Sequence, residues 1–184
     1  MKKATMTALL LSTCLAALSV AAEDVGEIFN YYEYSDEFAS AGQPTAAQLE
    51  AVRDAGFERV MYIAFSDQSR SLANEDRLVK DLGMEYVHIP VDWEAPTASE
   101  FYLFAGAMQR SPGKKTLLHC QANYRASAFA FLYRVLFEKV PVAQAKEDMN
   151  AVWTPNDTWR ELIFAILEEN GVSPDCAGCD WGDD

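Results

Sequence analysis

The sequence predicts an α/β domain with a mainly parallel central sheet, flanking helices and a helical C-terminal part. Two patterns lead to this prediction. Short apolar runs alternate with helix-spaced segments up to Cys120, and helical spacing alone continues beyond it. Parallel strands need a crossover connection that a helix commonly supplies, so such alternation is typical of a parallel sheet. The length of 184 residues and the 50% hydrophobic content suit one compact domain.

Turn and capping residues delimit the elements of the sheet region. Residues 31–41 are rich in aromatic residues and end at Gly42-Gln43-Pro44, which predicts one or two short strands closed by a turn. Thr45 is a suitable N-cap for the helix that follows. In chain order we then expect a helix over 46–55, a buried strand over 59–65, a helix over 71–82, a strand over 86–91, a helix over 97–109 and a strand over 115–119.

Three helices are expected beyond Cys120, over residues 125–139, 142–152 and 158–169. Asn156 and Asp157 are candidate caps for the last of them, because short polar side chains accept hydrogen bonds from the first turn of a helix. This helical part completes the single predicted domain.

The first 22 residues are expected to form a secretory signal peptide. Lys2 and Lys3 precede an apolar run over residues 8–20 that ends in small residues. The run is shorter than the ~20 apolar residues of a membrane span. We therefore expect an exported protein, periplasmic or secreted, with no membrane contact after cleavage. A lipoprotein anchored through Cys14 is the alternative.

Removal of the signal peptide leaves three cysteines in an oxidising compartment, namely Cys120, Cys176 and Cys179. The last two lie in an acidic tail over residues 173–184, which we expect to be mobile except where they tie it down. We expect them to form a structural disulfide, because a zinc ion would need four ligands and no histidine lies nearby. Cys120 is then the free thiol. Neither a metal nor a cofactor is expected.

Acidic residues outnumber basic ones by 28 to 15, which gives a formal net charge of −13. A chain with this charge repels the phosphates of nucleic acids and the head groups of anionic lipids. We therefore expect neither nucleic acid nor a membrane surface as a partner.

The sequence from Thr116 to Ser127 carries the most chemical information. It predicts a buried strand, a sharp loop that starts at Cys120, and a helix. Such a loop points backbone N–H groups inward beside a helix N-terminus, which creates an anion site and favours the thiolate form of Cys120. Arg125 adds a planar donor that can bind two oxygens of an oxyanion.

This arrangement resembles the cysteine-dependent protein phosphatases. The chain is similar to bacterial dual-specificity-phosphatase-like proteins related to the beta-lactamase-hydrolase-associated phosphatase group. The resemblance covers residues 38–150, and besides His119-Cys120 to Arg125 it includes the segments 39–44, 55–57 and 88–93. It implies a protein-tyrosine-phosphatase-like fold, with a phosphatase-like domain over residues 23–172.

The resemblance also implies roles for individual residues. Cys120 would attack phosphorus to form a phosphocysteine, Arg125 would hold the phosphoryl oxygens, and Asp92 would serve as general acid and then as base. Glu94 is a less favoured substitute for Asp92. The expected ligand is either a phosphorylated substrate, namely a phosphate monoester, or an inorganic oxyanion. The remaining residues of the expected phosphate-binding loop are His119, Gln121, Ala122, Asn123, Tyr124, Ala126 and Ser127.

The spacing of the motif departs from the common phosphatase signature. Four residues separate Cys120 from Arg125, where the family usually has five. The loop also lacks glycine, so we expect Asn123 to take any position that needs a positive φ. The shorter loop leaves two alternatives open. One is a rhodanese-like sulfurtransferase, and the other is a pseudophosphatase that binds an oxyanion without turnover.

Overall fold

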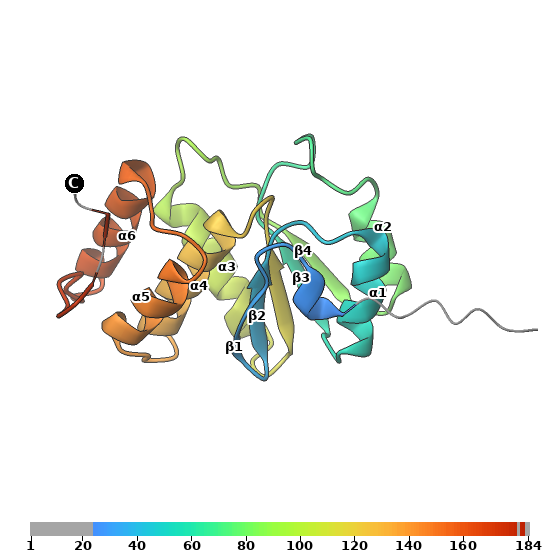
Figure 1. Cartoon of the computed structure of the whole chain (residues 1–184), viewed down its shortest axis with the longest axis horizontal. Coiled ribbons are helices and arrows are strands. Elements are labelled where there is room, and N and C mark those ends of the chain that lie inside the picture. The colour runs from blue at the N-terminus through green and yellow to red at the C-terminus, as the bar shows by residue number, and fades with distance from the viewer. Residues whose placement is uncertain (1–23, 180, 183–184) are drawn as a thin grey trace, which may run out of the picture.

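The structure is a computed structural model that describes residues 24–179, 181 and 182 (Figure 1). Its centre is a sheet of five strands in the order β1-β2-β5-β3-β4. Among the described strands, the β1–β2 pair is antiparallel and the other three pairs are parallel, which confirms the predicted α/β class. The strands are β1 (Tyr32–Ser35), β2 (Phe38–Ala41), β3 (Arg59–Tyr62), β4 (Glu85–His88) and β5 (Thr116–His119).

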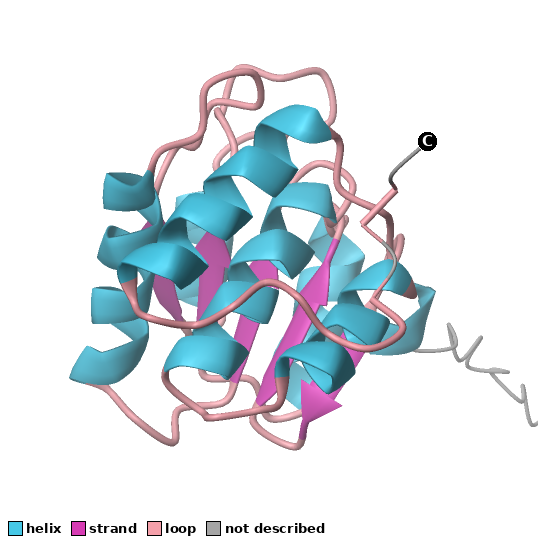
Figure 2. Cartoon of the chain, turned by 90° about the vertical axis from the view of Figure 1, so that its left-hand side faces the viewer, coloured by secondary structure: helices cyan, strands magenta, loops and turns pink. Residues whose placement is uncertain are grey.

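Helices cover both faces of the sheet (Figures 1 and 2). One face packs against α1 (Ala46–Asp54), α2 (Glu75–Asp81) and the short 3-10 helix η1 (Val25–Glu27). The opposite face packs against α4, around which the other three helices gather. These four helices are α3 (Ala98–Arg110), α4 (Tyr124–Leu136), α5 (Val142–Asn150) and α6 (Asp157–Glu169).

Helix starts follow the local capping rules. Thr45 and Thr97 each accept the backbone N–H three residues on, and the Gln48 and Glu100 side chains return the bond, so both helices begin with a capping box. Asn156 caps α6 through the N–H of Trp159. The predicted caps Thr45 and Asn156 are thus confirmed, and the three helices start within one residue of their predicted positions.

Two predicted strands and three predicted helices are too long by two residues or more; of the helices, those expected over 125–139 and 142–152 end at Leu136 and Asn150. The strands expected over 59–65 and 86–91 end at Tyr62 and His88. Their apolar residues continue because the chain stays buried after it leaves the sheet. The helix expected over 71–82 begins only at Glu75, since Asn74 has a left-handed φ of 57° that interrupts helical geometry.

The acidic tail makes a contact that the sequence did not predict. Cys176 and Cys179 form the predicted disulfide. Trp181, however, is buried, and its ring packs edge-on against Phe131 of α4 and Phe164 of α6. The expectation that the cysteines alone tie down the tail is therefore wrong at Trp181, because its aromatic side chain also packs against the helical face.

The predicted signal peptide and Cys14 lie outside the described residues. Within the part of the chain that the structure describes, no helix combines the length and apolar character needed to cross a bilayer.

The topology brings three loops to one edge of the sheet. β3, β4 and β5 are parallel neighbours, so the loops after them all leave from their carboxyl ends (Figure 1). This edge is where open α/β sheets bind ligands. It carries Cys120 after β5, Asp92 after β4 and Arg70 after β3.

Candidate active site

The loop between β5 and α4, residues 120–123, is anchored from its back. The backbone N–H of Cys120 donates to the Ala41 carbonyl at 3.3 Å, which extends the β5–β2 pairing by one residue. Two side-chain hydrogen bonds join Asn30, in the N-terminal segment, to the loop. Asn30 Nδ2 donates to the Ala122 carbonyl at 3.1 Å, and Asn123 Nδ2 donates to the Asn30 carbonyl at 2.6 Å. The N-terminal segment thus holds the loop.

Asn123 makes the short loop possible. Its φ is 70° and its ψ is −1°, in the left-handed region that Asn tolerates better than most residues. The chain therefore turns sharply at this residue, and α4 begins at Tyr124, with Arg125 as its second residue. The expectation that Asn123 supplies the positive φ is confirmed.

Several backbone N–H groups of the loop and of the first turn of α4 are without an acceptor in the described part of the chain. The backbone N–H groups of Gln121, Ala122, Tyr124 and Arg125 donate to no acceptor among the described residues. Tyr124 and Arg125 form the first turn of α4, where the helix dipole favours an anion. The loop thus has the features of an oxyanion site.

Cys120, Arg125 and Asp92 line one cleft of about 740 Å³. The free thiol of Cys120 is buried at its floor. The loops after β3 and β4 and the start of α4 form its walls, which include three aromatic side chains. The lining residues are Phe65, Gln68, Ser69, Arg70, Asp92, Trp93, Glu94, Cys120, Gln121, Ala122, Tyr124 and Arg125.

Arg125 is only 5% exposed, yet it forms none of the ion pairs found among the described residues. Its guanidinium carbon lies 5.3 Å from the centroid of the Trp93 ring, and its Nε has no hydrogen-bond partner there. A buried cation without a counter-charge is costly. Its place beside Cys120 therefore suits an anionic ligand.

Asp92 stands at the solvent side of the cleft and is exposed. Its Oδ1 accepts the backbone N–H of Glu94 at 2.8 Å, so the carboxylate also caps the turn after β4. Glu94 lines the same cleft and is exposed as well. Asp92 is thus held by a turn while it remains open to the cleft.

The other predicted loop residues divide into two groups. Gln121, Ala122 and Tyr124 line the cleft, as stated above. His119, Asn123, Ala126 and Ser127 are buried and do not line it. The Ser127 hydroxyl donates to the Tyr124 carbonyl at 3.2 Å, within the first turn of α4.

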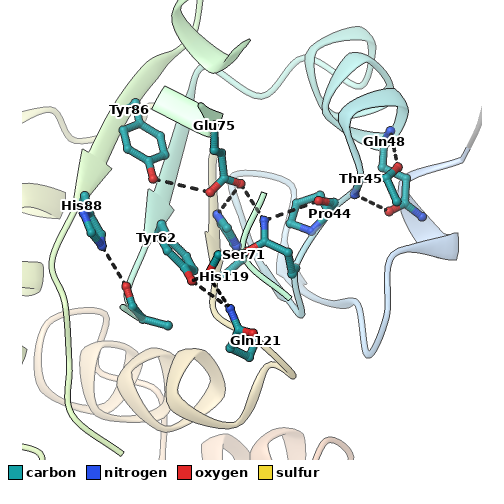
Figure 3. Close-up of polar contacts among 12 residues, drawn as sticks. Pro44, Thr45, Gln48, Tyr62, Ser71, Glu75, Tyr86, His88, His119 and Gln121 are labelled. Atoms are coloured by element: carbon teal, nitrogen blue, oxygen red, sulfur yellow. Dashed lines mark hydrogen bonds and ion pairs between the residues drawn. The ribbon is translucent and has the colours of Figure 1, made fainter. Parts of the chain in front are cut away.

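His119 contacts a buried carboxylate that the sequence did not reveal. Its Nε2 lies 3.2 Å from Oε1 of Glu75, the first residue of α2 (Figure 3). Gln43 Nε2 donates to the same oxygen at 2.8 Å, and the Tyr86 hydroxyl donates to Oε2 at 3.4 Å. Burial raises the pKa of Glu75, but the charge of His119 and these hydrogen bonds outweigh it and hold the pKa below its usual value.

Tyr62 connects this pair to the cysteine loop. Its ring is stacked between the imidazoles of His119 and His88, at centroid distances of 4.8 and 5.2 Å. Its hydroxyl accepts a hydrogen bond from Gln121 Nε2 at 2.8 Å and is paired with Ser71 Oγ at 2.7 Å (Figure 3). Burial raises the pKa of Tyr62, so the hydroxyl keeps its proton.

Arg70 is a second cation at the cleft that the sequence analysis missed. Its backbone N–H donates to Gln121 Oε1 at 3.1 Å, and its guanidinium carbon lies 5.5 Å from the ring centroid of Phe29. Arg70 is exposed. The sequence did offer one signal, because a polar segment follows the carboxyl end of a predicted strand at the same sheet edge as Cys120.

A family model matches most of the chain. The model described as "DSP-PTPase phosphatase fused to NAD+ Kinase" matches residues 18–161. No curated protein sequence matches the chain.

Solved structures of phosphatases are similar to this one. A putative phosphatase (DUF442) from Shewanella putrefaciens CN-32 is 31% identical, with a TM-score of 0.73 over 79% of this chain and 96% of that chain. Two others show similarity of fold alone. Tk-PTP in its active form is 16% identical, with a TM-score of 0.65 over 76% of this chain and 97% of that one. A putative phosphatase from Neisseria meningitidis Z2491 is 16% identical, with a TM-score of 0.61 over 74% and 98%.

Proposed function

The chain belongs to the DSP-PTPase phosphatase family whose model it matches, and from this premise we propose that it hydrolyses a phosphate monoester through a phosphocysteine intermediate on Cys120. One observation carries the proposal. Cys120, the uncompensated Arg125 and Asp92 line the same cleft, beside backbone N–H groups that have no acceptor among the described residues.

The first step transfers the phosphoryl group to sulfur. The Cys120 thiolate attacks phosphorus, the S–P bond forms and the P–O bond to the leaving group breaks. Arg125 and the loop N–H groups bind the three non-bridging oxygens, whose charge they stabilise in the transition state. Asp92 gives its proton to the leaving oxygen.

The second step releases phosphate. A water molecule loses a proton to the Asp92 carboxylate and attacks phosphorus, and the S–P bond breaks to restore the thiolate. The exposure of Asp92 supports this role, because the water must reach the phosphocysteine from the open side of the cleft. The products are inorganic phosphate and an alcohol or phenol.

The walls of the cleft favour a phosphate carried on an organic group. Phe65, Trp93 and Tyr124 line the cleft that contains Cys120. The volume of about 740 Å³ lies in the range of small-molecule sites and exceeds what one phosphate fills. An aryl phosphate is therefore a suitable first substrate.

Two alternatives are less well supported. A rhodanese-like sulfurtransferase needs no general acid, whereas Asp92 is held at the cleft. A pseudophosphatase would use the same N–H groups and Arg125 to bind an oxyanion without turnover. The pseudophosphatase differs from the proposed phosphatase only in that its Cys120 does not react with the bound oxyanion.

Hydrolysis of p-nitrophenyl phosphate tests the proposal. We expect turnover by the wild-type chain, a covalent phosphoenzyme after rapid quenching, and neither with Cys120→Ser. Absence of Cys120-dependent turnover, together with tight vanadate binding, would support the pseudophosphatase instead. Cyanide-dependent consumption of thiosulfate would support sulfur transfer.

Export is part of the proposal. Residues 1–22 would be removed as a signal peptide, and the phosphatase domain would extend from residue 23 to residue 172, with the tail docked on it. The Cys176–Cys179 disulfide supports an oxidising compartment. Mass spectrometry of the protein from a periplasmic extract should find Glu23 as the first residue, and an intact N-terminus in the cytoplasm would contradict export.

A further inference from the structure

Glu75 is a buried carboxylate that the proposed mechanism does not use. Its side chain is only 3% exposed, although it begins a surface helix. An ionised carboxylate at such a depth is unfavourable unless its oxygens are hydrogen-bonded. Both oxygens of Glu75 have partners, and all three partners come from the sheet or from the turn after β2 (Figure 3).

Two of these contacts lead to the cysteine loop. His119 is joined to Cys120 by a peptide bond, and its ring is fixed between Glu75 and Tyr62. Gln43 donates its side chain to Glu75, and its backbone N–H donates to the Gln121 carbonyl at 3.4 Å. One carboxylate therefore restrains the residues on both sides of Cys120.

The charge of Glu75 also needs compensation. A lone carboxylate close to Cys120 would oppose formation of the thiolate. His119, the residue next to Cys120, places its Nε2 3.2 Å from Glu75 Oε1 and so gives this carboxylate a polar partner on the side of the thiol. Each element packed around Glu75, His119 and the Cys120 thiol contributes other titratable or charged groups. They are Tyr62 of β3, Arg70 of the next loop, Tyr86 and His88 of β4, Asp92 and Glu94 after β4, and Tyr124 and Arg125 of α4.

We propose that Glu75 is a positioning residue for the proposed phosphatase reaction, which holds the ring of His119 in place at 3.2 Å and thereby keeps the loop around Cys120 competent to bind an anion and to present a thiolate. This inference rests on the proposed function. Glu75 acts only through His119 and Gln43, and it touches neither the substrate nor the reacting sulfur.

The test compares Glu75→Gln with Asp76→Asn. Both changes remove one negative charge from the start of α2, but Asp76 is half exposed and pairs with Lys80 of the same helix, at 3.6 Å. The readouts are the pH dependence of iodoacetamide alkylation of Cys120 and the kinetics with p-nitrophenyl phosphate. We expect Glu75→Gln to shift the alkylation midpoint to higher pH by about one unit and to lower kcat about 10-fold. Asp76→Asn should match the wild type.

The outcomes separate this inference from the proposed function. Failure of the wild type to hydrolyse the ester would overturn the function, whereas the alkylation profile tests Glu75 without turnover. A folded Glu75→Gln variant with the wild-type alkylation profile would overturn the inference. Equal shifts in both variants would do the same. A double variant with His119→Gln should shift no further than His119→Gln alone, since Glu75 acts through that ring, and additive shifts would contradict this route.

Discussion

The guanidinium of Arg125 lies over the ring of Trp93, 5.3 Å from its centroid, and this contact joins the start of α4 to the loop that carries Asp92. It is worth about 1 to 2 kcal/mol in a desolvated site. The contact orients a buried cation whose Nε has no acceptor among the described residues. The contact thereby fixes the position of Arg125, proposed to bind the phosphate, relative to the loop of Asp92, proposed to protonate the leaving group.

Replacement of Arg125 by Lys should therefore impair catalysis strongly. Lysine keeps the charge but loses the planar donor pair and the stacking on Trp93. We expect kcat/KM for p-nitrophenyl phosphate to fall by about 100-fold and vanadate binding to weaken. Arg53→Lys, at an exposed pair with Asp54, is the matched control and should leave both values unchanged. Equal activity of Arg125→Lys and the wild type would exclude bidentate binding.

Asp92→Asn should reveal the general acid through its dependence on the leaving group. Asparagine can still accept the Glu94 N–H, so the turn is retained. We expect about a 100-fold loss of kcat with phenyl phosphate, whose leaving oxygen needs a proton, and a much smaller loss with p-nitrophenyl phosphate.

Glu94→Gln is the control for the Asp92 prediction, because Glu94 lines the same cleft. It should behave like the wild type with both substrates. A larger loss in Glu94→Gln than in Asp92→Asn would move the acid role to Glu94.

Asn123 should be sensitive to replacement by alanine. Alanine at a φ of 70° costs about 1 to 2 kcal/mol of backbone strain, and the hydrogen bond to the Asn30 carbonyl is lost as well. Glycine tolerates this φ without strain, although it also lacks the hydrogen bond to Asn30. Asn123→Gly should therefore be more stable than Asn123→Ala. Urea unfolding measures the difference, and the reverse order would contradict a strained position.

Local rules predicted much of this fold, and long-range contacts account for what they missed. Thr45 and Asn156 cap helices through neighbours within three residues, so the sequence pattern was sufficient. Asn123 was predictable because few residue types accept a positive φ.

Glu75 was not predictable in the same way. Glu75 meets His119 only because β3 and β5 are adjacent and α2 returns beside them, and a glutamate at a helix start is otherwise an ordinary surface residue. Trp181 was missed for a similar reason, since its partners lie on α4 and α6.

Trp181→Ala should destabilise the chain without impairing the site. The ring is buried against Phe131 and Phe164, and Lys146 Nζ lies 4.5 Å from its centroid. Loss of a buried tryptophan costs about 3 to 5 kcal/mol. We expect a lower midpoint of urea unfolding, with kcat unchanged at low temperature. Leu103→Ala, at a residue 62% exposed, is the control and should have little effect. Equal midpoints would mean that the tail contributes no stability.

Stability should depend on pH through Glu75. Burial raises the pKa of this carboxyl, but His119, Gln43 and Tyr86 together hold it below its usual value in the folded chain. A group with a lowered folded pKa contributes stability that is fully present above the unfolded value of about 4.3 and is lost as the pH falls through the folded value. The wild type should therefore exceed Glu75→Gln in unfolding free energy at neutral pH, and the difference should shrink below about pH 4. Urea titrations across this range measure it, and a difference that stays constant with pH would contradict the lowered pKa.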